Sequence, residues 1–263
     1  MTLLEAEGLR KDFGPVRAVN DVSFRLEEGR SLGIVGESGS GKTTIARMLV
    51  DLETPDAGKV LVDGRRRRNE RLARAREIQM VFQDPYLSLD PRITVHDCLA
   101  EVLRLHLRPG RAEMEGRIAE LLDQVGLGPR EAGCLPRQLS GGQRQRVAIA
   151  RALACEPRVL ILDEAVAALD VSVQAQILNL LCDIRRDTGI GYLFISHDLA
   201  VVRYVTDDVL VLHRGTAVET GFTESVLMAP RHPYTRLLRE SVPRPGWDPS
   251  AIARARRRLA QRR

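Results

Sequence analysis

The residues with the clearest chemical signature lie in a glycine-rich segment that begins at residue 36. It consists of Gly36, Glu37, Ser38, Gly39, Ser40, Gly41, Lys42, Thr43 and Thr44, which fits the pattern of a phosphate-binding loop. Glycines let successive backbone N–H groups converge on a polyphosphate, and a helix starting near Lys42 presents its positive end to the same anion. We expect Lys42 to reach the outer phosphates and the Thr43 hydroxyl to ligate Mg²⁺.

Two adjacent acids supply the second half of a hydrolytic site. Asp163 and Glu164 follow the apolar run 159–162, which reads as a buried strand. Ligands collect at the carboxyl ends of parallel strands, so we expect both carboxylates beside the phosphates. Neighbouring acids on an extended chain point in different directions. We therefore predict that Asp163 holds the Mg²⁺ shell and that Glu164 orients or deprotonates the attacking water, the alternative being a merely charged strand end.

A second helix start could also bind an anion. Its residues are Ser140, Gly141, Gly142 and Gln143. The chain thus has two phosphate-seeking helix ends but one acidic strand to complete a hydrolytic site. This surplus predicts that the second helix end serves a nucleotide held by a neighbouring molecule.

The elements that must position these residues alternate between strands and helices. We expect strands at 16–26, 31–35, 57–64, 77–83, 159–162 and 192–195, and helices after Lys42, at 95–107, at 111–125, after Gly141 and at 172–186. This alternation predicts an α/β fold with a mostly parallel sheet covered on both faces. We expect one domain over 1–243, with a helical subdomain inserted at about 93–155.

Residues 244–263 are expected to form a basic, flexible C-terminal tail. The last thirteen residues contain six arginines and no acid. Their charge of +6 exceeds the formal net charge of +5, so residues 1–250 are nearly neutral. A second basic run extends from Arg65 to Arg76. We interpret both runs as solvated surface, with attraction to anionic lipid or to a partner as the alternative. Nucleic acid is not expected as a partner, because no aromatic residues are interleaved for base stacking.

Hydropathy and cysteine usage suggest a cytoplasmic chain. No aliphatic run approaches the roughly 20 residues that cross a bilayer, and Glu5 and Glu7 stand where a secretion signal would be apolar. The four cysteines lie at positions 98, 134, 155 and 182, which matches neither a close-paired metal site nor a disulfide framework. We expect reduced and mostly buried thiols.

The order of these motifs resembles the nucleotide-binding subunit of ABC transporters, from Leu3 to about Pro243. The resemblance implies the P-loop NTPase fold of an ABC ATPase, with an antiparallel β subdomain, and an activity of ATP hydrolysis coupled to transport. It also implies a head-to-tail dimer in which Ser140–Gln143, the signature sequence, contacts the γ-phosphate of ATP held by the opposite subunit. The chain itself has no internal repeat.

Four further residues take roles from the same resemblance. Gln83 is similar to the glutamine that senses Mg²⁺ and faces the membrane subunit, Asp170 to the D-loop aspartate, and His197 to the switch histidine near the γ-phosphate. Phe13 stands where the family has an aromatic residue that stacks on adenine, more often Tyr. The implied catalytic residues are Glu164, His197, Gln83 and Lys42, and the implied metal ligands are Thr43, Gln83 and Asp163.

One departure from the family pattern follows Glu164. Ala165 and Val166 occupy positions that are commonly Pro and Thr. Neither carboxylate is lost, so hydrolysis is still expected. The loop that links Glu164 to the dimer interface is altered, and coupling between the two sites could differ in detail.

Two segments, 81–92 and 229–238, resemble the peptide and nickel importer ATPases. They imply uptake of di- or oligopeptides, and the Asp-Glu-Ala-Val stretch keeps a nickel or metal-chelate importer as the alternative. No Cys follows Cys182, so a cluster-binding tail is not expected. The implied partners are two transmembrane permease subunits, a second ATPase subunit that is a paralogue or an identical copy, and an extracytoplasmic solute-binding protein. The implied location is the cytoplasmic face of the membrane.

Two other classes are disfavoured. A soluble ABC ATPase acting on nucleic acid would need a long coiled-coil insertion or two cassettes. A small-molecule phosphotransferase would leave the Ser140–Gln143 segment unexplained.

Overall fold

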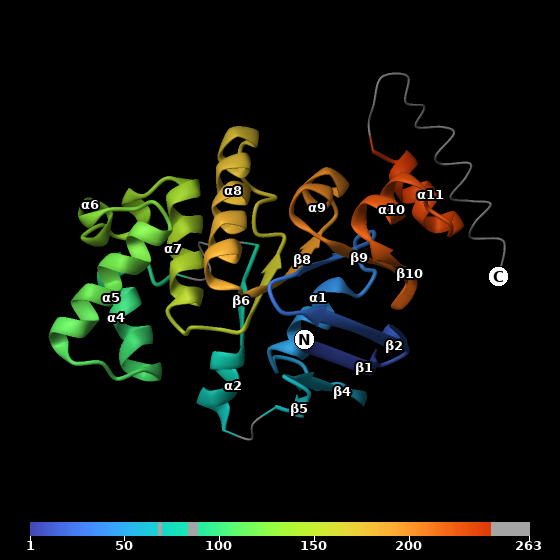
Figure 1. Ribbon diagram of the computed structural model, residues 1–263, viewed down its shortest axis with the longest axis horizontal. Helices are drawn as coiled ribbons and strands as arrows, with labels where there is room; N and C mark the ends of the chain where they lie inside the picture. Colours follow the sequence, from blue (N-terminus) through green and yellow to red (C-terminus); the bar gives the residue numbers. More distant parts are fainter. Residues whose placement is uncertain (68–69, 84–88, 243–263) are drawn as a thin grey trace. The chain divides into compact units, whose positions relative to one another are not determined.

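The computed structural model describes residues 1–67, 70–83 and 89–242 (Figure 1). They form two compact units. The phosphate-loop unit comprises Glu5–Arg25, Ser31–Val60 and the chain from Phe194 onward. The acidic-strand unit comprises Met1–Leu4, Leu26–Arg30 and Leu61–Leu193. The predicted tail at 244–263 lies outside the described residues.

Parallel pairing places the phosphate loop at a strand end. In the phosphate-loop unit, β3 (Ser31–Val35) runs parallel to β9 (Asp208–His213), with Leu32 opposite Asp208 and Val35 opposite Val211. The hairpin strand β10 (Thr216–Phe222) pairs antiparallel with β9. All five residues of β3 are buried, as a parallel strand covered on both faces requires. A second sheet contains β2 (Val16–Glu27), β1 (Thr2–Phe13) and β4 (Ala57–Val62), in that order.

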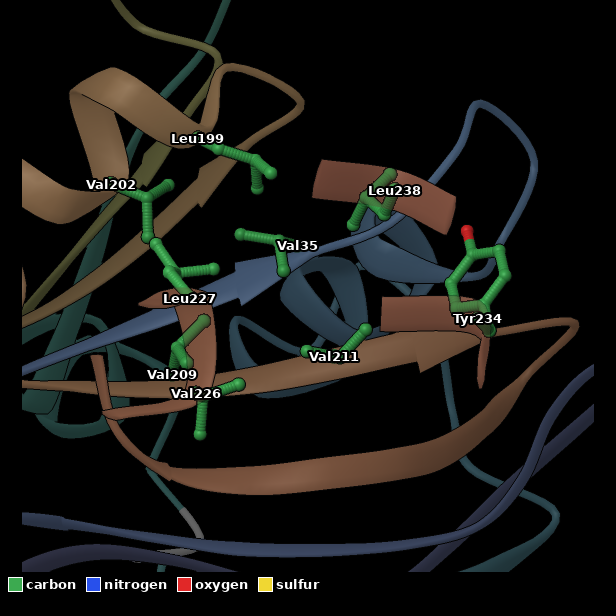
Figure 2. Close-up of a cluster of buried hydrophobic side chains, with 9 residues drawn as sticks. All are labelled: Val35, Leu199, Val202, Val209, Val211, Val226, Leu227, Tyr234 and Leu238. Atoms are coloured by element: carbon green, nitrogen blue, oxygen red, sulfur yellow. The ribbon is translucent and has the colours of Figure 1, made fainter. Parts of the chain in front are cut away.

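The described residues of the same unit form four helices. They are α1 (Lys42–Leu49), α9 (Leu199–Val205), α10 (Thr223–Met228) and α11 (Pro233–Glu240). An apolar cluster joins α9, α10 and α11 to the sheet (Figure 2). Its members are Val35, Leu199, Val202, Val209, Val211, Val226, Leu227, Tyr234 and Leu238. Gly33 permits this packing, since a Cβ there would lie 2.7 Å from Val202 Cγ1.

The acidic-strand unit is built around a second parallel pair. Strand β6 (Ile78–Val81) lies parallel to β7 (Val159–Asp163), with Ile78 opposite Val159 and Val81 opposite Leu162. Every residue of β7 is buried. The helices α7 (Gly141–Leu153) and α8 (Val171–Thr188) flank this strand in the chain, and α7 packs on β6. Strand β8 (Gly191–Ser196) begins in this unit and ends in the phosphate-loop unit.

Residues 94–153 contain the predicted helices. They are α4 (Val95–His106), α5 (Arg111–Gln124), the single turn α6 (Pro129–Ala132) and a 3₁₀ turn at Pro136–Gln138, followed by α7. Helices α4, α5 and α7 all contact one another. The predicted domain boundaries stay a prediction.

The basic run is not uniformly solvated. It forms the short strand β5 (Arg65–Arg66), which pairs with β4, and helix α2 (Arg71–Glu77). The Arg67 side chain is only 7% exposed, and its Nε lies 3.3 Å from a Glu77 carboxylate oxygen. For Arg67 our interpretation as solvated surface was therefore wrong, because a buried guanidinium is retained when a carboxylate pairs with it.

Two other expectations concern the described part of the chain. None of its helices combines the length and apolar character that a membrane span requires. The described residues form no disulfide; Cys98 and Cys155 are buried, and Cys134 and Cys182 are half-buried. The reduced state of these thiols stays a prediction.

Candidate nucleotide-binding site

The phosphate loop connects β3 to α1. At two positions of the loop no residue larger than glycine fits. A Cβ at Gly36 would overlap the carbonyl oxygen of Leu212. Gly41 has a φ of 105°, and a Cβ there would overlap the carbonyl oxygen of Ala18. Both positions require glycine for steric reasons, and Gly41 also requires it for its backbone conformation.

Lys42 and Ser40 give the loop its polar interior. Lys42 is 6% exposed, and its Nζ donates to the carbonyl oxygens of Gly36 and Glu37, both at 2.9 Å. The ammonium is thus folded back over its own loop. Ser40 is buried as well, and its Oγ has no hydrogen-bond partner among the described residues. Since α1 begins at Lys42, the first N–H groups of that helix also lie at the loop, which suits a polyphosphate.

Thr43, the predicted metal ligand of the loop, is exposed at the first turn of α1. Our prediction adds the Gln83 amide and the Asp163 carboxylate to this hydroxyl, and hard oxygen donors of these kinds are what Mg²⁺ takes together with phosphates. These residues belong to different units. Within the part of the chain that the structure describes, there is no group of three or more His, Cys, Asp or Glu residues that could hold a metal by itself. The Mg²⁺ site therefore remains a proposal.

His197 lies in the phosphate-loop unit, directly after β8. It is exposed, and both of its neighbours fix the turn around it. Ser196 Oγ accepts a hydrogen bond from Asp198 N at 3.0 Å. Asp198 Oδ1 in turn accepts from Ala200 N at 2.8 Å and from Val201 N at 3.3 Å, which caps α9. The turn thus presents the imidazole at the carboxyl end of a buried strand.

Phe13 ends β1 in the same unit and is 45% exposed. The ammonium of Lys11 lies 5.4 Å from the centroid of its ring. An exposed aromatic ring can stack on a base, as the family resemblance implies. Its role at adenine stays a prediction.

The acidic pair ends β7 in the other unit. Asp163 is 7% exposed, whereas Glu164 is half-buried and adopts a left-handed φ of 48°. Such a backbone is uncommon outside glycine and clusters at functional sites. Ala167 N donates to the Glu164 carbonyl oxygen at 3.0 Å, which closes the turn, and Ala165 and Val166 inside it are buried.

The signature segment forms the start of α7. Ser140 is its exposed N-cap residue, and Gln143 stands three positions later. Gly142 lies against α8, where a Cβ would come within 2.5 Å of Val173 Cγ1. The second glycine of the segment is therefore needed for helix packing, whatever it does toward a nucleotide.

Gln83 and Asp170 complete the predicted set in the acidic-strand unit. Gln83 is exposed two residues beyond the end of β6. Asp170 is the exposed N-cap residue of α8, and its carbonyl oxygen accepts from Gln174 N at 2.8 Å. The structure thus places the phosphate loop, Phe13 and His197 in one unit, and the remaining predicted residues in the other.

One contact with the loop was not expected from the sequence. Glu37 N donates to the hydroxyl of Tyr234 at 3.0 Å. In the sequence Tyr234 stands out only as part of segment 229–238, which resembles the peptide and nickel importer ATPases, and no local pattern links it to a loop 197 residues away.

Comparison with known proteins shows the family to which the chain belongs. The family model described as ABC transporter matches residues 19–167, and the chain belongs to this family. The model described as oligopeptide/dipeptide transporter, C-terminal region, matches residues 218–261. The predicted resemblance is confirmed by both matches.

Two curated relatives are close in sequence. The chain is 49% identical over 246 residues to the oligopeptide transport ATP-binding protein OppD of Mycobacterium tuberculosis. The aligned region covers 92% of this chain and 40% of OppD. The chain thus spans well under half the length of that relative. The chain is 45% identical over 249 residues to the di/tripeptide transport ATP-binding protein DppF of Pseudomonas aeruginosa. This aligned region covers 93% of this chain and 77% of DppF.

A solved structure confirms the predicted fold class. It is a dimeric post-hydrolysis state of the ATP-binding cassette MJ0796, bound to ADP and Pi. The TM-score is 0.74 at 29% identity, over 84% of this chain and 99% of that chain. The chain therefore has the α/β fold of an ABC ATPase.

Proposed function

We propose that this chain is the ATP-hydrolysing subunit of an importer for di- or oligopeptides. The observation that carries the ATP-binding step is the loop itself: a buried Lys42 folded over carbonyl oxygens, glycines where no side chain fits, and a helix starting at the same lysine. Positive charge and backbone N–H groups at one loop support the binding of a triphosphate there. A protein that only binds phosphate would not need the acidic strand end as well.

Hydrolysis requires charge stabilisation and an oriented water. Lys42 supplies fixed positive charge toward the outer phosphates, where negative charge develops during phosphoryl transfer. Glu164 orients or deprotonates the attacking water, and His197 and Gln83 act near the γ-phosphate. Thr43, Gln83 and Asp163 would hold Mg²⁺, which, when bound, neutralises charge on the phosphates.

The second helix start gives a reason for a dimer. Ser140–Gln143 would contact ATP bound to the loop of a second subunit, either an identical copy or a paralogue. The dimeric state of the MJ0796 cassette supports such an arrangement by similarity. Closure of the two subunits around two ATP molecules would then move the attached membrane subunits.

A hollow near Gln83 supports docking of permease subunits. It has a volume of about 240 Å³ and lies between β6, α4 and α7. Phe82 and Leu105, two exposed apolar side chains, line it together with Glu101 and Arg151. Apolar side chains within a polar rim are typical of protein interfaces. We place the chain at the cytoplasmic face of a membrane through this contact.

The substrate class rests on the C-terminal region and on the relatives. Both the match at 218–261 and the names of OppD and DppF point to peptides. The solute itself would be chosen by the permease and an extracytoplasmic binding protein. Nickel or a metal chelate remains the alternative, and nucleic acid is not proposed as a partner.

The test uses the assembled transporter with its binding protein. Dipeptide-loaded binding protein should accelerate ATP turnover, and nickel-loaded binding protein should not. The reverse result would establish the alternative, and acceleration by neither would remove the importer function. Glu164→Gln in the same complex should retain ATP binding while turnover falls by about 100-fold or more. Unchanged turnover in that variant would remove Glu164 from its role.

A further inference from the structure

Helix α11 contacts the phosphate loop through the side chain of Tyr234. Tyr234 is 1% exposed, and Figure 2 shows its ring at one end of the apolar cluster. Its hydroxyl accepts the hydrogen bond from Glu37 N at 3.0 Å. A tyrosine ring that packs in a core while its hydroxyl meets a backbone group is held in position at both ends.

The residues around Tyr234 fix its direction. His232 is the N-cap of α11, and its Nδ1 accepts from Tyr234 N at 3.2 Å. Pro233 occupies the first helical position, where its fixed φ favours the helix. The carboxylate of Glu219 accepts from Arg231 N at 2.8 Å and from His232 N at 3.1 Å, which anchors the segment that enters the helix.

A second ring holds Tyr234 from β9. His213, at the end of that strand, stacks on it with the ring centroids 3.9 Å apart and the planes 20° from parallel. The preceding residue is Leu212, whose carbonyl oxygen lies against Gly36 of the loop. Thus the strand that supports the loop also supports the tyrosine.

Glu37 is held through both of its backbone polar groups. Its N–H group donates to Tyr234, while the Glu37 carbonyl oxygen accepts from Lys42 Nζ at 2.9 Å and from Ser40 N at 3.1 Å. If the tyrosine hydroxyl is lost, this N–H group is left without that acceptor, which is costly where water has limited access. The Lys42 ammonium bonds to the same residue, so a loosened Glu37 also loosens the lysine.

From these contacts we infer that Tyr234 is a positioning residue for the nucleotide site: its hydroxyl holds the phosphate loop, through Glu37 N–H, in the shape that binds ATP. This role rests on the proposed function. It makes α11 part of the nucleotide site, so a movement of α11 would also change the conformation of the loop.

The experiment measures binding of the fluorescent nucleotide MANT-ATP to the purified chain. Tyr234→Phe keeps the ring and removes only the hydroxyl, so we expect the affinity to fall about five-fold. In hydrolysis assays the same variant should raise KM for ATP and leave kcat nearly unchanged, because Tyr234 touches no reacting atom.

Tyr192→Phe is the matched control. Tyr192 is also buried, and its hydroxyl has no hydrogen-bond partner in the part of the chain that the structure describes. This variant should bind MANT-ATP like the wild type. Equal affinity in Tyr234→Phe and wild type, or an equal loss in both variants, would overturn the inference.

Amide hydrogen exchange on the wild-type chain keeps the inference testable if Tyr234→Phe does not fold. The Glu37 amide should exchange more slowly than that of Gly39, an exposed neighbour in the loop. Equally fast exchange would overturn the hydrogen bond and the inference. If the wild-type chain binds no MANT-ATP, the proposed function fails, a result that the wild-type measurement reveals without any variant.

Discussion

Ser140 and Gln143 hold each other's backbone at the start of α7. Ser140 Oγ accepts from Gln143 N at 3.2 Å, and Gln143 Oε1 accepts from Ser140 N at 2.9 Å. This reciprocal pair is a capping box, which satisfies two N–H groups that the helix leaves unpaired. The segment that we propose to contact a neighbouring nucleotide is thus already ordered within its own chain.

Substitutions at Ser140 can separate these two roles. Asp caps a helix as well as Ser does, so the free energy of unfolding of Ser140→Asp should lie within about 0.5 kcal/mol of the wild-type value. Its carboxylate would repel a γ-phosphate, so ATP-dependent dimerisation should be lost. Urea unfolding and sedimentation of each variant with ATP measure the two effects.

Ser140→Ala is the converse control. It removes the cap and should lower the free energy of unfolding by about 1 kcal/mol. It adds no negative charge, so some ATP-dependent dimer should remain. Normal dimerisation of Ser140→Asp would contradict the proposed contact with phosphate.

Gly142 is predicted to be a packing residue. A Cβ would approach Val173 Cγ1 to 2.5 Å, and a β-branched side chain has little freedom to move away. Gly142→Ala should therefore lower the free energy of unfolding, measured in urea, by about 1–3 kcal/mol. Adding Val173→Ala makes room for the new methyl group, and the double variant should recover most of that loss. No recovery would show that the glycine is needed for another reason.

His213 should make the fold sensitive to acid. Burial, with Arg214 beside it, lowers the pKa of His213 below its usual value of 6.5. The unfolded chain then binds the proton more readily, so this stabilising contribution is present above pH 6.5 and is lost as the pH falls through the lowered pKa. We expect the wild type to lose more stability than His213→Phe between about pH 7.5 and about pH 5.

His213→Phe keeps a ring to stack on Tyr234 but cannot titrate. His96, whose pKa the Glu115 carboxylate raises, acts in the opposite direction and is present in both proteins, so it cancels. Thermal unfolding at several pH values provides the measurement. Parallel curves for the two proteins would contradict the prediction.

The four thiols should divide into two classes. Burial raises the pKa of the Cys155 thiol to about 11 and raises that of Cys98 as well. The thiolate is the reactive form, so both should react slowly with DTNB at about pH 8. Cys134 and Cys182, which are half-buried, should react first, and all four should react in urea. Labelling of Cys155 as fast as that of Cys134 in the folded chain would contradict this assignment.

The sequence predicted elements whose signal is local. Strand β7 was predictable because a parallel strand buried on both faces needs a continuous apolar run. The phosphate loop was predictable because its chemistry fixes the residue types at successive positions. Helices α4 and α5 were recognised from their apolar periodicity, and the observed ends lie within one residue of the predicted ones.

Elements whose signal is not local were missed. Strand β1 buries Leu3, Leu4 and Leu9 without strict alternation, so it lacks the period of a half-buried strand. Helices α10 and α11 have six and eight residues, too few for a clear helical period. The contact of Tyr234 with Glu37 depends on the tertiary fold, which brings α11 to the phosphate loop.

The central claim is that ATP on one phosphate loop is completed by residues 140–143 of another subunit. An experimental structure of Glu164→Gln with ATP and Mg²⁺ tests it most directly, because this variant should bind ATP without consuming it. We predict that Ser140 Oγ of one subunit lies about 3 Å from a γ-phosphate oxygen of the ATP held by the other. A bound triphosphate with residues 140–143 remote from it would contradict the account.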